Sequence, residues 1–351
     1  MIIPIMSIVL LTLGLICKKD KRMFYILWVF MIIIIIMNTY NADWDAYEFM
    51  YSLINSIDRC LLTDVGYGIL NYIANIWLHL NFFQFRALFT LSGMLILRKT
   101  ILSESPYPTL VLVLYFIAPF FPNDIVQIRN FMSQVLLTFF LTKWIDSEKK
   151  KLIYFVLAIG LAITMHASAA YFAVFILIYF IKDDKKLYLG VAIGALLVGG
   201  LPTILNRIPF ISVEKINFYL GSMSRSIDVR GFIIICVFLV QLSVLYIIRK
   251  CAEKSVNCRF KIWADIVYKM NILCIPACII MAVWTFNFYR VPRNLLILNY
   301  IVYSMYLKEE KKQSIINFIT LIMIMCGVCW SALNSFSQWS VIWSNNALIT
   351  W

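Results

Sequence analysis

The chain has 351 residues, of which 62% are hydrophobic and 14% are charged, and it carries a net charge of +13. Soluble domains contain about 25% charged residues, so this composition excludes a soluble globular protein and indicates an integral membrane protein. The apolar runs are continuous rather than alternating, which predicts membrane helices and not a transmembrane barrel. The positive charge lies in short clusters between these runs, as the positive-inside rule requires, and no surface for nucleic acid is expected.

The basic clusters orient the expected helices, because such clusters mark the cytoplasmic side of a membrane. The first apolar run, Ile2 to Ile16, is followed by basic residues rather than preceded by them. This order is the reverse of a signal peptide, so we expect a retained span whose N-terminus lies outside. The clusters that we place inside are residues 18–22, 98–99, 143–151, 182–186, 249–261 and 308–312.

With these clusters inside, the sequence predicts an all-α, polytopic helical bundle of about 12 spans in a single transmembrane domain, residues 1–351, with both termini outside. If residues 65–80 were also a span, the chain would cross the membrane an odd number of times between the inner clusters 18–22 and 98–99. We therefore interpret residues 65–80 as a helix on the outer face or a re-entrant helix. The expected outer loops are 38–81, 122–129, 206–230 and 285–294, followed by an outer tail, 331–351. The expected spans are residues 2–16, 23–37, 82–97, 107–122, 126–141, 152–165, 168–181, 187–205, 231–248, 266–284, 295–307 and 315–330.

Arginine and lysine divide between the two expected sides. Lysines lie almost entirely in the inner clusters, whereas many arginines lie in outer segments. The positive-inside rule acts on both cations alike and would not separate arginine from lysine. The planar guanidinium group of arginine, however, binds two phosphate oxygens at once, and the lysine ammonium group does not. The outer face is therefore expected to bind an anion such as a phosphate. The outer arginines are Arg59, Arg86, Arg129, Arg207, Arg225, Arg230, Arg290 and Arg293.

Four polar stretches fall on the expected outer side, and the first is residues 41–51. On a helix, Asp43, Tyr47 and Tyr51 would share one face, with Trp44 and Asp45 beside them. A carboxylate next to aromatic rings suits sugar binding with a general base. The alternative is a solvated interfacial helix with an aromatic belt.

The second and third stretches are residues 123–130 and 164–168. Gln127 and Arg129 lie at the start of an expected span, where an arginine is a functional candidate. The alternatives are an arginine that extends to the interface or one that pairs with Asp124. His166 lies among small residues near an outer turn and could bind a phosphate or a sugar hydroxyl, or it could be a structural histidine.

The fourth stretch, residues 286–294, carries Arg290 and Arg293 on either side of a proline, and Tyr300 follows. Cations and free N–H groups at the start of a helix favour an anion. The alternative is an outer loop whose arginines pair with acidic residues. The loop 206–230, with Arg225, is a less specific candidate.

Some motifs are absent or uninformative. Closely spaced cysteines, such as Cys326 and Cys329, lie inside apolar runs without a nearby histidine, so we interpret them as small buried side chains rather than zinc ligands. The sequence has no glycine-rich phosphate loop and no hydrolase nucleophile motif, so nucleotide chemistry on the cytoplasmic side is not expected.

Taken together and in this order, these stretches resemble the EpsG family of Wzy-like polysaccharide polymerases. The resemblance extends from about Met23 to about Tyr306 and departs from the family pattern in two places. Asp64-Val stands where such proteins usually have Glu-Pro, and Asn130 follows Arg129 where they usually have glutamine. The matching pieces are Asp43-x-x-x-Tyr47, Asp64-Val-Gly66-Tyr67-Gly-Ile-Leu70-Asn, Arg129-Asn130, His166-Ala-Ser168, and Arg290 with Tyr300.

The resemblance implies a membrane glycosyltransferase of the C-type class in the bacterial cytoplasmic membrane. Its donor and acceptor would be undecaprenyl-pyrophosphate-linked repeat units, joined at the outer face into capsule, exopolysaccharide or O-antigen. A flippase and a chain-length regulator are candidate partners besides the lipid bilayer. No cofactor is required, although a divalent metal held by Asp43 and Asp45 stays open.

The resemblance also implies residue roles. Asp43 would be the general base, with Asp45 as its substitute, and His166 would orient a phosphate or a hydroxyl. The remaining candidates are cations for the lipid pyrophosphate and side chains for the sugar: Arg129, Arg290, Arg225, Arg293, Trp44, Tyr47, Tyr51, Gln127 and Tyr300.

Three other functions stay open. An outer-face glycan ligase or acyltransferase would share the lipid carrier but not the acceptor, and a structural membrane partner would not need the polar stretches. A transporter or flippase of lipid-linked glycans should place charged residues at mid-membrane and on both faces. The inner side is expected to carry orientation charges only, which favours a polymerase.

Overall fold

The computed structural model describes residues 2–147, 149–181, 183–198, 229–283 and 286–347. The described chain is helical, apart from turns and one isolated bridge between Asn38 and Asn346. The expected span 187–205 is described only in its first part. The loop 206–230, with Arg207 and Arg225, lies outside the described residues except for Val229 and Arg230.

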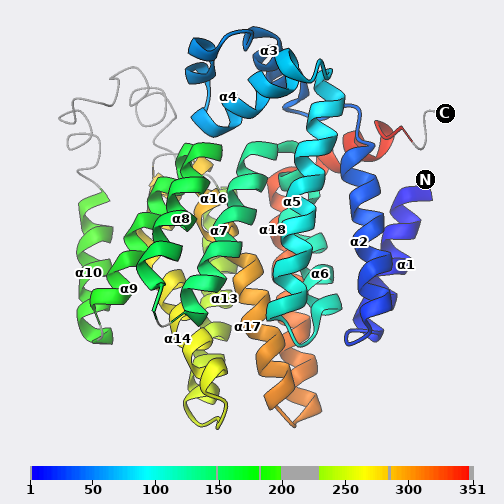
Figure 1. Ribbon diagram of the computed structural model, residues 1–351. Coiled ribbons are helices and arrows are strands. Elements are labelled where there is room, and N and C mark those ends of the chain that lie inside the picture. The colour runs from blue at the N-terminus through cyan, green and yellow to red at the C-terminus, as the bar shows by residue number, and fades with distance from the viewer. Residues whose placement is uncertain (1, 148, 182, 199–228, 284–285, 348–351) are drawn as a thin grey trace.

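The helices run up and down between two ends of one bundle (Figure 1). We call the end covered by α3 and α4 the cap end, and the opposite end the lysine end. The helices are α1 (Ile2–Ile16), α2 (Lys21–Ile36), α3 (Trp44–Leu53), η1 (Ile57–Leu62), α4 (Val65–Tyr72), η2 (Ile73–Trp77), α5 (Phe82–Glu104), α6 (Pro108–Tyr115), η3 (Phe116–Asp124), α7 (Ile128–Asp146), α8 (Lys151–Met165), η4 (Ala167–Ile176), α9 (Leu177–Phe180), α10 (Asp184–Leu197), α13 (Val229–Glu253), α14 (Cys258–Leu273), α15 (Ile275–Val283), η7 (Phe286–Tyr289), α16 (Arg290–Arg293), α17 (Leu296–Glu309) and α18 (Gln313–Ser344).

Several of these helices have the properties of membrane spans. Within the described residues, three are long and apolar enough to cross a bilayer: Val229–Glu253, Cys258–Ala282 and Gln313–Ala332. Shorter apolar helices accompany them at Ile2–Ile16, Pro108–Ala118, Lys151–Met165 and Ala167–Phe180. Large apolar side chains such as Leu152, Leu196 and Phe232 face outward, where only lipid would make them favourable. The chain is therefore an all-helical membrane protein.

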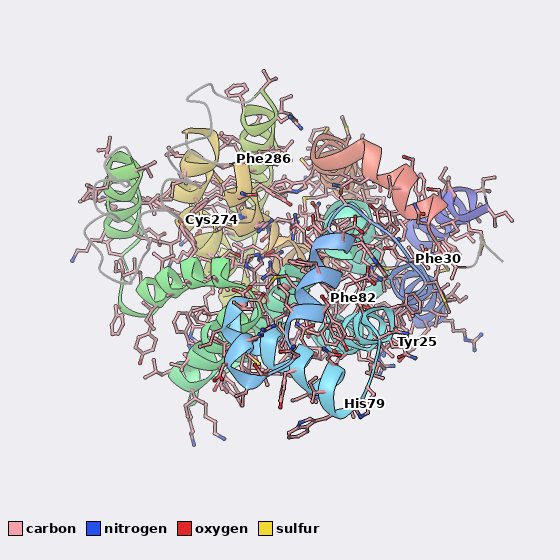
Figure 2. All side chains as sticks on the ribbon, turned by 90° about the horizontal axis from the view of Figure 1, so that it is seen from above. Tyr25, Phe30, His79, Phe82, Cys274 and Phe286 are labelled. Atoms are coloured by element: carbon pink, nitrogen blue, oxygen red, sulfur yellow. The ribbon has the colours of Figure 1, made fainter. Side chains whose placement is uncertain are left out.

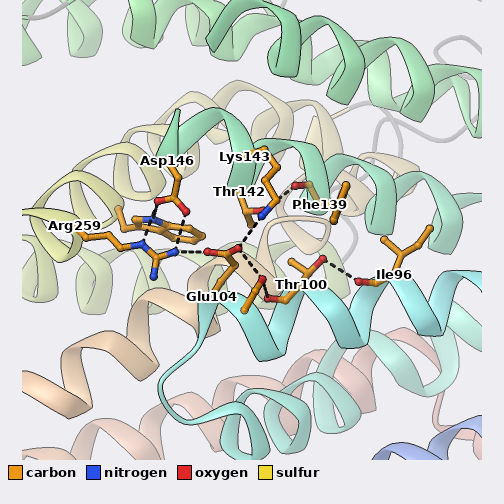
Figure 3. Close-up of polar contacts among 10 residues, drawn as sticks. Ile96, Thr100, Glu104, Phe139, Thr142, Lys143, Asp146 and Arg259 are labelled. Carbon is orange, nitrogen blue, oxygen red and sulfur yellow. Dashed lines mark hydrogen bonds and ion pairs between the residues drawn. The ribbon is translucent and has the colours of Figure 1, made fainter. Parts of the chain in front are cut away.

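The connections from α1 to α2, from α5 to α6, from α13 to α14 and from α17 to α18, which lie in or near basic clusters, are found at the lysine end (Figure 1). Their side chains join neighbouring helices. Glu104 at the end of α5 is only 3% exposed and accepts from Lys143 of α7 at 3.3 Å and from Arg259 of α14. Arg259 also pairs with Asp146 at 2.8 Å (Figure 3).

A second ionic network joins α10, α13 and α14. Arg249 of α13 and Lys269 of α14 each pair with Asp184 of α10 and with Asp265. The expectation that this side carries orientation charges only is wrong, because its cations also pair with acids of neighbouring helices, and one of these acids, Glu104, is buried and needs a cation. Within each network, the acidic side chains pair with the basic ones.

The cap end is built from short helices that lie across the bundle. Figure 2, seen from this end, shows α3 and α4 over its middle, with Phe82 labelled among them. The run 65–80 forms the short helices α4 and η2 at the cap end. Gly68 allows α4 to pack closely on η1, since a Cβ atom there would clash with the Cys60 carbonyl oxygen.

An aromatic cluster holds α3 and α4 onto the bundle. Tyr51 stacks on Phe85, with ring centroids 5.2 Å apart, and Tyr67 meets Phe89 edge to face at 5.4 Å. Such pairs stabilise by about 0.5–1.5 kcal/mol each beyond their buried area. The cap is therefore a packed layer that fixes the position of the polar side chains beneath it.

The C-terminal part of the chain differs from expectation. We expected a tail after residue 330, but α18 continues to Ser344 and reaches the end of α2 (Figure 1). Trp339 and Trp343 meet edge to face with ring centroids 5.2 Å apart, and Ile342 is fully buried. This periodic apolar pattern continues the helix beyond the hydrophobic run.

Candidate functional site

The site lies under the cap, where α7, the turn after α8, and α16 meet. Arg129, in the first turn of α7, donates from Nη1 to Thr63 Oγ1 at 2.7 Å and to Asp64 Oδ2 at 3.0 Å. Its guanidinium group lies over the rings of Tyr47 and Tyr67, 5.4 and 5.7 Å from their centroids. Arg129 is thus oriented by a carboxylate and by two aromatic faces of the cap.

Asp64 also reaches the histidine turn. Its Oδ1 atom accepts from the backbone N–H of Ala167 at 3.0 Å. One carboxylate therefore links the α7 arginine to the segment His166–Ser168. Asp64, which stands where the family pattern usually has glutamate, thus lies at the junction of these two segments.

His166 lies between α8 and η4 and faces Arg290, with 3.0 Å between its Nε2 atom and Nη1 of the arginine. The backbone N–H of Ser168 faces the other ring nitrogen at 3.4 Å. Burial, helped by Arg290, Arg129 and Arg293, lowers the pKa of His166 to about 3. The imidazole is therefore neutral near pH 7, and its shorter contact fits an acceptor for Arg290.

Arg293 has a different environment, because both it and its partner Asp124 are completely buried, with 3.3 Å between Nη2 and Oδ1. Its Nη1 atom donates to Gln127 Oε1 and to the Tyr289 hydroxyl, each at 3.2 Å. Gln127 also donates to Tyr289 at 2.8 Å. The alternative pairing of Arg129 with Asp124 is not observed, since Arg293 occupies that carboxylate.

Two asparagines fix the arginine-bearing helices relative to each other. Asn130 and Asn294 each follow an arginine of the site, and their side-chain amides exchange hydrogen bonds of 3.1 and 3.2 Å. Both are buried. This reciprocal pair joins α7 to the end of α16.

Asp43 precedes α3 and is partly buried. No hydrogen bond or ion pair holds its carboxylate within the described residues. Burial raises its pKa above the ordinary value, while Arg290 and Arg129 oppose that shift. Tyr47, one turn later, has its pKa raised by burial and lies close enough for Arg129 and Asp43 to act on it. Asp43 is thus an unrestrained carboxyl group facing two guanidinium groups.

The other predicted site residues make different contacts, although Trp44 and Tyr51 share an aromatic cluster with Tyr47. Asp45 is exposed and accepts from Tyr40 at 3.0 Å. Trp44 packs edge to face on Phe82, and the Tyr51 hydroxyl donates to the Leu80 carbonyl at 2.7 Å. Tyr300 is completely buried in α17. The structure brings together Asp43, Tyr47, Gln127, Arg129, His166, Arg290 and Arg293, and Arg225 lies outside the described residues.

Arg86 changes the interpretation of the outer arginines. It is 1% exposed, and its two terminal nitrogens donate to the carbonyl groups of Ile35, Asn38 and Ile125 and to the Asn38 side chain. An arginine at the cap end can therefore have a structural role, in which it donates hydrogen bonds to backbone carbonyl groups. The sequence alone does not distinguish this role from ligand binding.

Sequence reasoning missed the contributions of Thr63 and Tyr289. Neither residue has a distinctive spacing in the sequence. Their neighbours were the available signal, since Tyr289 directly precedes Arg290 and Thr63 directly precedes Asp64, which belongs to a stretch that resembles the family. Within the described residues, no group of three or more His, Cys, Asp or Glu side chains could hold a metal ion. Asp43 and Asp45 do not form such a group.

Several buried hydrogen-bond donors of the site are unpaired within the described residues. The Nε atoms of Arg129 and Arg290 and the hydroxyl of Ser168 are buried, and none has a partner within the described part of the chain. Buried donors are normally satisfied, so unpaired ones indicate a missing acceptor. An anion with several oxygens, such as a phosphate, supplies acceptors only. The arrangement can therefore bind an anion beside a carboxyl group.

The fold and the site define a class of protein: an all-helical membrane protein with an arginine-rich polar site under a helical cap. The family model of the EpsG family matches residues 21–344, and the chain belongs to this family of Wzy-like exopolysaccharide polymerases. No curated protein and no solved structure matches the chain. Membership indicates a role in polysaccharide polymerisation and a glycosyltransferase-like activity.

Proposed function

We propose that the protein joins lipid-linked oligosaccharide repeat units into a polysaccharide by glycosyl transfer. The donor and acceptor are units attached to undecaprenyl pyrophosphate. Family membership supports the polymerase class, and the unpaired donors of Arg129, Arg290 and Ser168 support a pyrophosphate ligand. Those donors are the observation that carries the proposal, because a sugar-binding site alone would not need buried, unpaired arginine nitrogens.

The reaction assigns a role to each facing group. A hydroxyl of the acceptor sugar attacks the anomeric carbon of the donor, and the bond from that carbon to the pyrophosphate oxygen breaks. The electron pair leaves with the lipid pyrophosphate, whose charge Arg290 and Arg129 neutralise. The hydroxyl proton passes to the carboxylate of Asp43, whose raised pKa suits a general base better than an ordinary carboxylate does.

His166 supports this reaction without carrying a proton. Because its pKa lies near 3, it accepts a hydrogen bond from Arg290 and directs that guanidinium group toward the pyrophosphate. Tyr47 supplies an aromatic surface beside Asp43. Arg293 and Gln127 hold the α16 segment, since Asp124 already neutralises Arg293.

The same proposal fixes the membrane orientation. The lysine end faces the cytoplasm, by the positive-inside rule, and the cap end faces the outer side of the bacterial cytoplasmic membrane. The chain then crosses the bilayer about twelve times, counting the shorter apolar helices as spans. The reacting sugars lie at the membrane boundary because their carrier is anchored in the bilayer. A flippase supplies the units, and a chain-length regulator limits the product.

A flippase is the main competing function. The ionic networks of the lysine end do not favour it, because their members pair with one another, whereas the donors at the cap end are unpaired. A glycan ladder assay in reconstituted vesicles separates the two functions.

The variants Asp43→Asn and Arg290→Ala should abolish the ladder, with rate losses of at least roughly 100-fold, as for other groups that act in a transition state. The matched controls are Asp58→Asn and Arg59→Ala, two exposed residues of η1 in the same cap. Near-normal ladders from Asp43→Asn or Arg290→Ala in well-folded protein would contradict the assignment.

A further inference from the structure

Residues 345–347, which we call the strap, follow α18 and bind the segment that leads to Asp43. The backbone N–H of Thr39 donates to the Asn345 carbonyl at 2.9 Å, and that of Ala347 donates to the Met37 carbonyl at 2.8 Å. These contacts form the single bridge between Asn38 and Asn346. The strap therefore extends α18 across the end of α2, just beyond the last residue of the family match.

Side chains reinforce this backbone pairing. Asn346 is completely buried and donates from Nδ2 to the Ile34 carbonyl at 3.2 Å. Asn38, also completely buried, donates from Nδ2 to the Asn345 carbonyl at 3.1 Å. Buried amides of this kind persist only where they are satisfied, so the strap and the α2 end are matched to each other.

A chain of hydrogen bonds continues from the strap to Asp43. Asn41 donates from Nδ2 to Asn38 Oδ1 at 2.9 Å. The Oδ1 atom of Asn41 then accepts from the backbone N–H of Asp43 at 3.1 Å. The chain therefore runs from the Asn345 carbonyl through the side chains of Asn38 and Asn41 to the proposed base, while Asn346 fixes the strap to α2.

Arg86 locks the middle of this chain. Its Nη2 atom donates to Asn38 Oδ1 at 3.2 Å and to the Ile125 carbonyl at 3.1 Å. Ile125 adjoins Asp124, the partner of Arg293. Arg86 therefore joins the segment that leads to Asp43 to the residues that precede α7. Its guanidinium group also lies 5.3 Å from the Trp44 ring centroid.

We propose that the strap is a positioning element of the polymerase, which holds the Asn38–Asp43 segment so that the Asp43 carboxylate faces Arg129 and Arg290. The proposal rests on the proposed function, in which Asp43 is the base. A misplaced base loses rate even when substrate still binds, because proton transfer depends on distance and orientation.

Two strap variants of the full chain test this role. Asn346→Ala removes the bond to Ile34, and Ala347→Pro removes the N–H that binds Met37. We expect hydrogen exchange in peptides covering residues 38–47 to accelerate roughly tenfold in both variants, as for loss of one net hydrogen bond. We expect kcat to fall roughly tenfold or more while KM for the lipid-linked units changes by less than about threefold.

The matched control is Asn345→Ala, because within the described residues the Asn345 side chain donates hydrogen bonds to its own helix end, at Val341 and Ser344, while its backbone carbonyl stays in place. This variant should leave both exchange and kcat near the parent values. Equal losses in Asn345→Ala would overturn the proposal, since they would reflect fraying of α18. Faster exchange without a fall in kcat would also overturn it.

Hydrogen exchange needs no substrate, so it separates this proposal from the proposed function. If the parent makes no ladder, the polymerase assignment fails while the exchange result still shows whether the strap holds the segment. If the parent is active and neither exchange nor kcat responds to Asn346→Ala and Ala347→Pro, the strap proposal is wrong.

Discussion

The three arginines of the site differ in their partners, and the partner determines what each arginine can do. Arg293 is neutralised by Asp124 in a fully buried pair, and removing one partner of such a pair costs roughly 3–5 kcal/mol. Arg129 shares Asp64 with the Ala167 amide. Arg290 faces only a neutral histidine among its bonded partners in the described chain. Its charge is therefore the most available to a ligand.

The pH dependence of the reaction follows from Asp43 and His166. Asp43 must be deprotonated to act as a base, and its pKa is raised by burial, so the rate should fall as pH drops through that raised value. His166 has a pKa of about 3 and stays neutral over the pH range in which Asp43 titrates. The histidine should therefore cause no change of rate in the pH profile. The pH profile of kcat/KM therefore should have one acid limb near the raised carboxyl value.

The variant His166→Gln provides the comparison, because the glutamine side-chain oxygen can still accept from Arg290. We expect a lower rate but an acid limb at the same pH as in the parent. Disappearance of the limb in His166→Gln would assign the titration to the histidine and remove the basis for Asp43 as the base.

At the scale of helices, the site depends on the amide pair between α7 and α16. In Asn130→Leu, the amide of Asn294 would stay buried without a partner, which should cost about 1–2 kcal/mol of unfolding free energy and displace Arg129 from Arg290. The double variant Asn130→Leu/Asn294→Leu should be less destabilised than the sum of the single variants. Thermal unfolding in detergent measures both quantities.

A second amide pair serves as the control. Asn271 and Asn299 exchange hydrogen bonds of 2.8 and 3.1 Å between α14 and α17, apart from the arginines. Asn271→Leu should destabilise the protein to a similar degree without lowering the polymerisation rate of the folded fraction. Additive single and double effects at residues 130 and 294, or equal rate losses at both pairs, would contradict the positioning role.

The sequence predicts the helices better than it predicts their partners. Continuous apolar runs located most helices, since a membrane helix must be apolar over its length. Helix ends were less predictable: α14 begins at Cys258, inside a cluster that we expected to be a loop, because Asn257 caps it by accepting from the Phe260 N–H. The α18 extension to Ser344 was missed because its polar residues interrupt the hydrophobic run.

At the scale of the whole molecule, the pairings that build the site were not predictable. Asp64 and Arg129 are 65 residues apart, and Asn130 and Asn294 are 164 residues apart, so no local spacing relates them. The sequence did identify most of the residues that the site brings together, since polar groups are rare in such a chain. It also selected Trp44, Tyr51 and Tyr300, whose rings are packed against other side chains, and a motif alone does not separate an aromatic residue that packs from one that binds a sugar.

The central claim, that this protein alone lengthens lipid-linked glycans, is tested most directly in vesicles that contain only the purified protein and labelled lipid-linked repeat units. The account predicts a ladder of products that increase by whole repeat units, with one lipid pyrophosphate released for each glycosidic bond formed. Transfer of units to the opposite leaflet without any lengthening would contradict it.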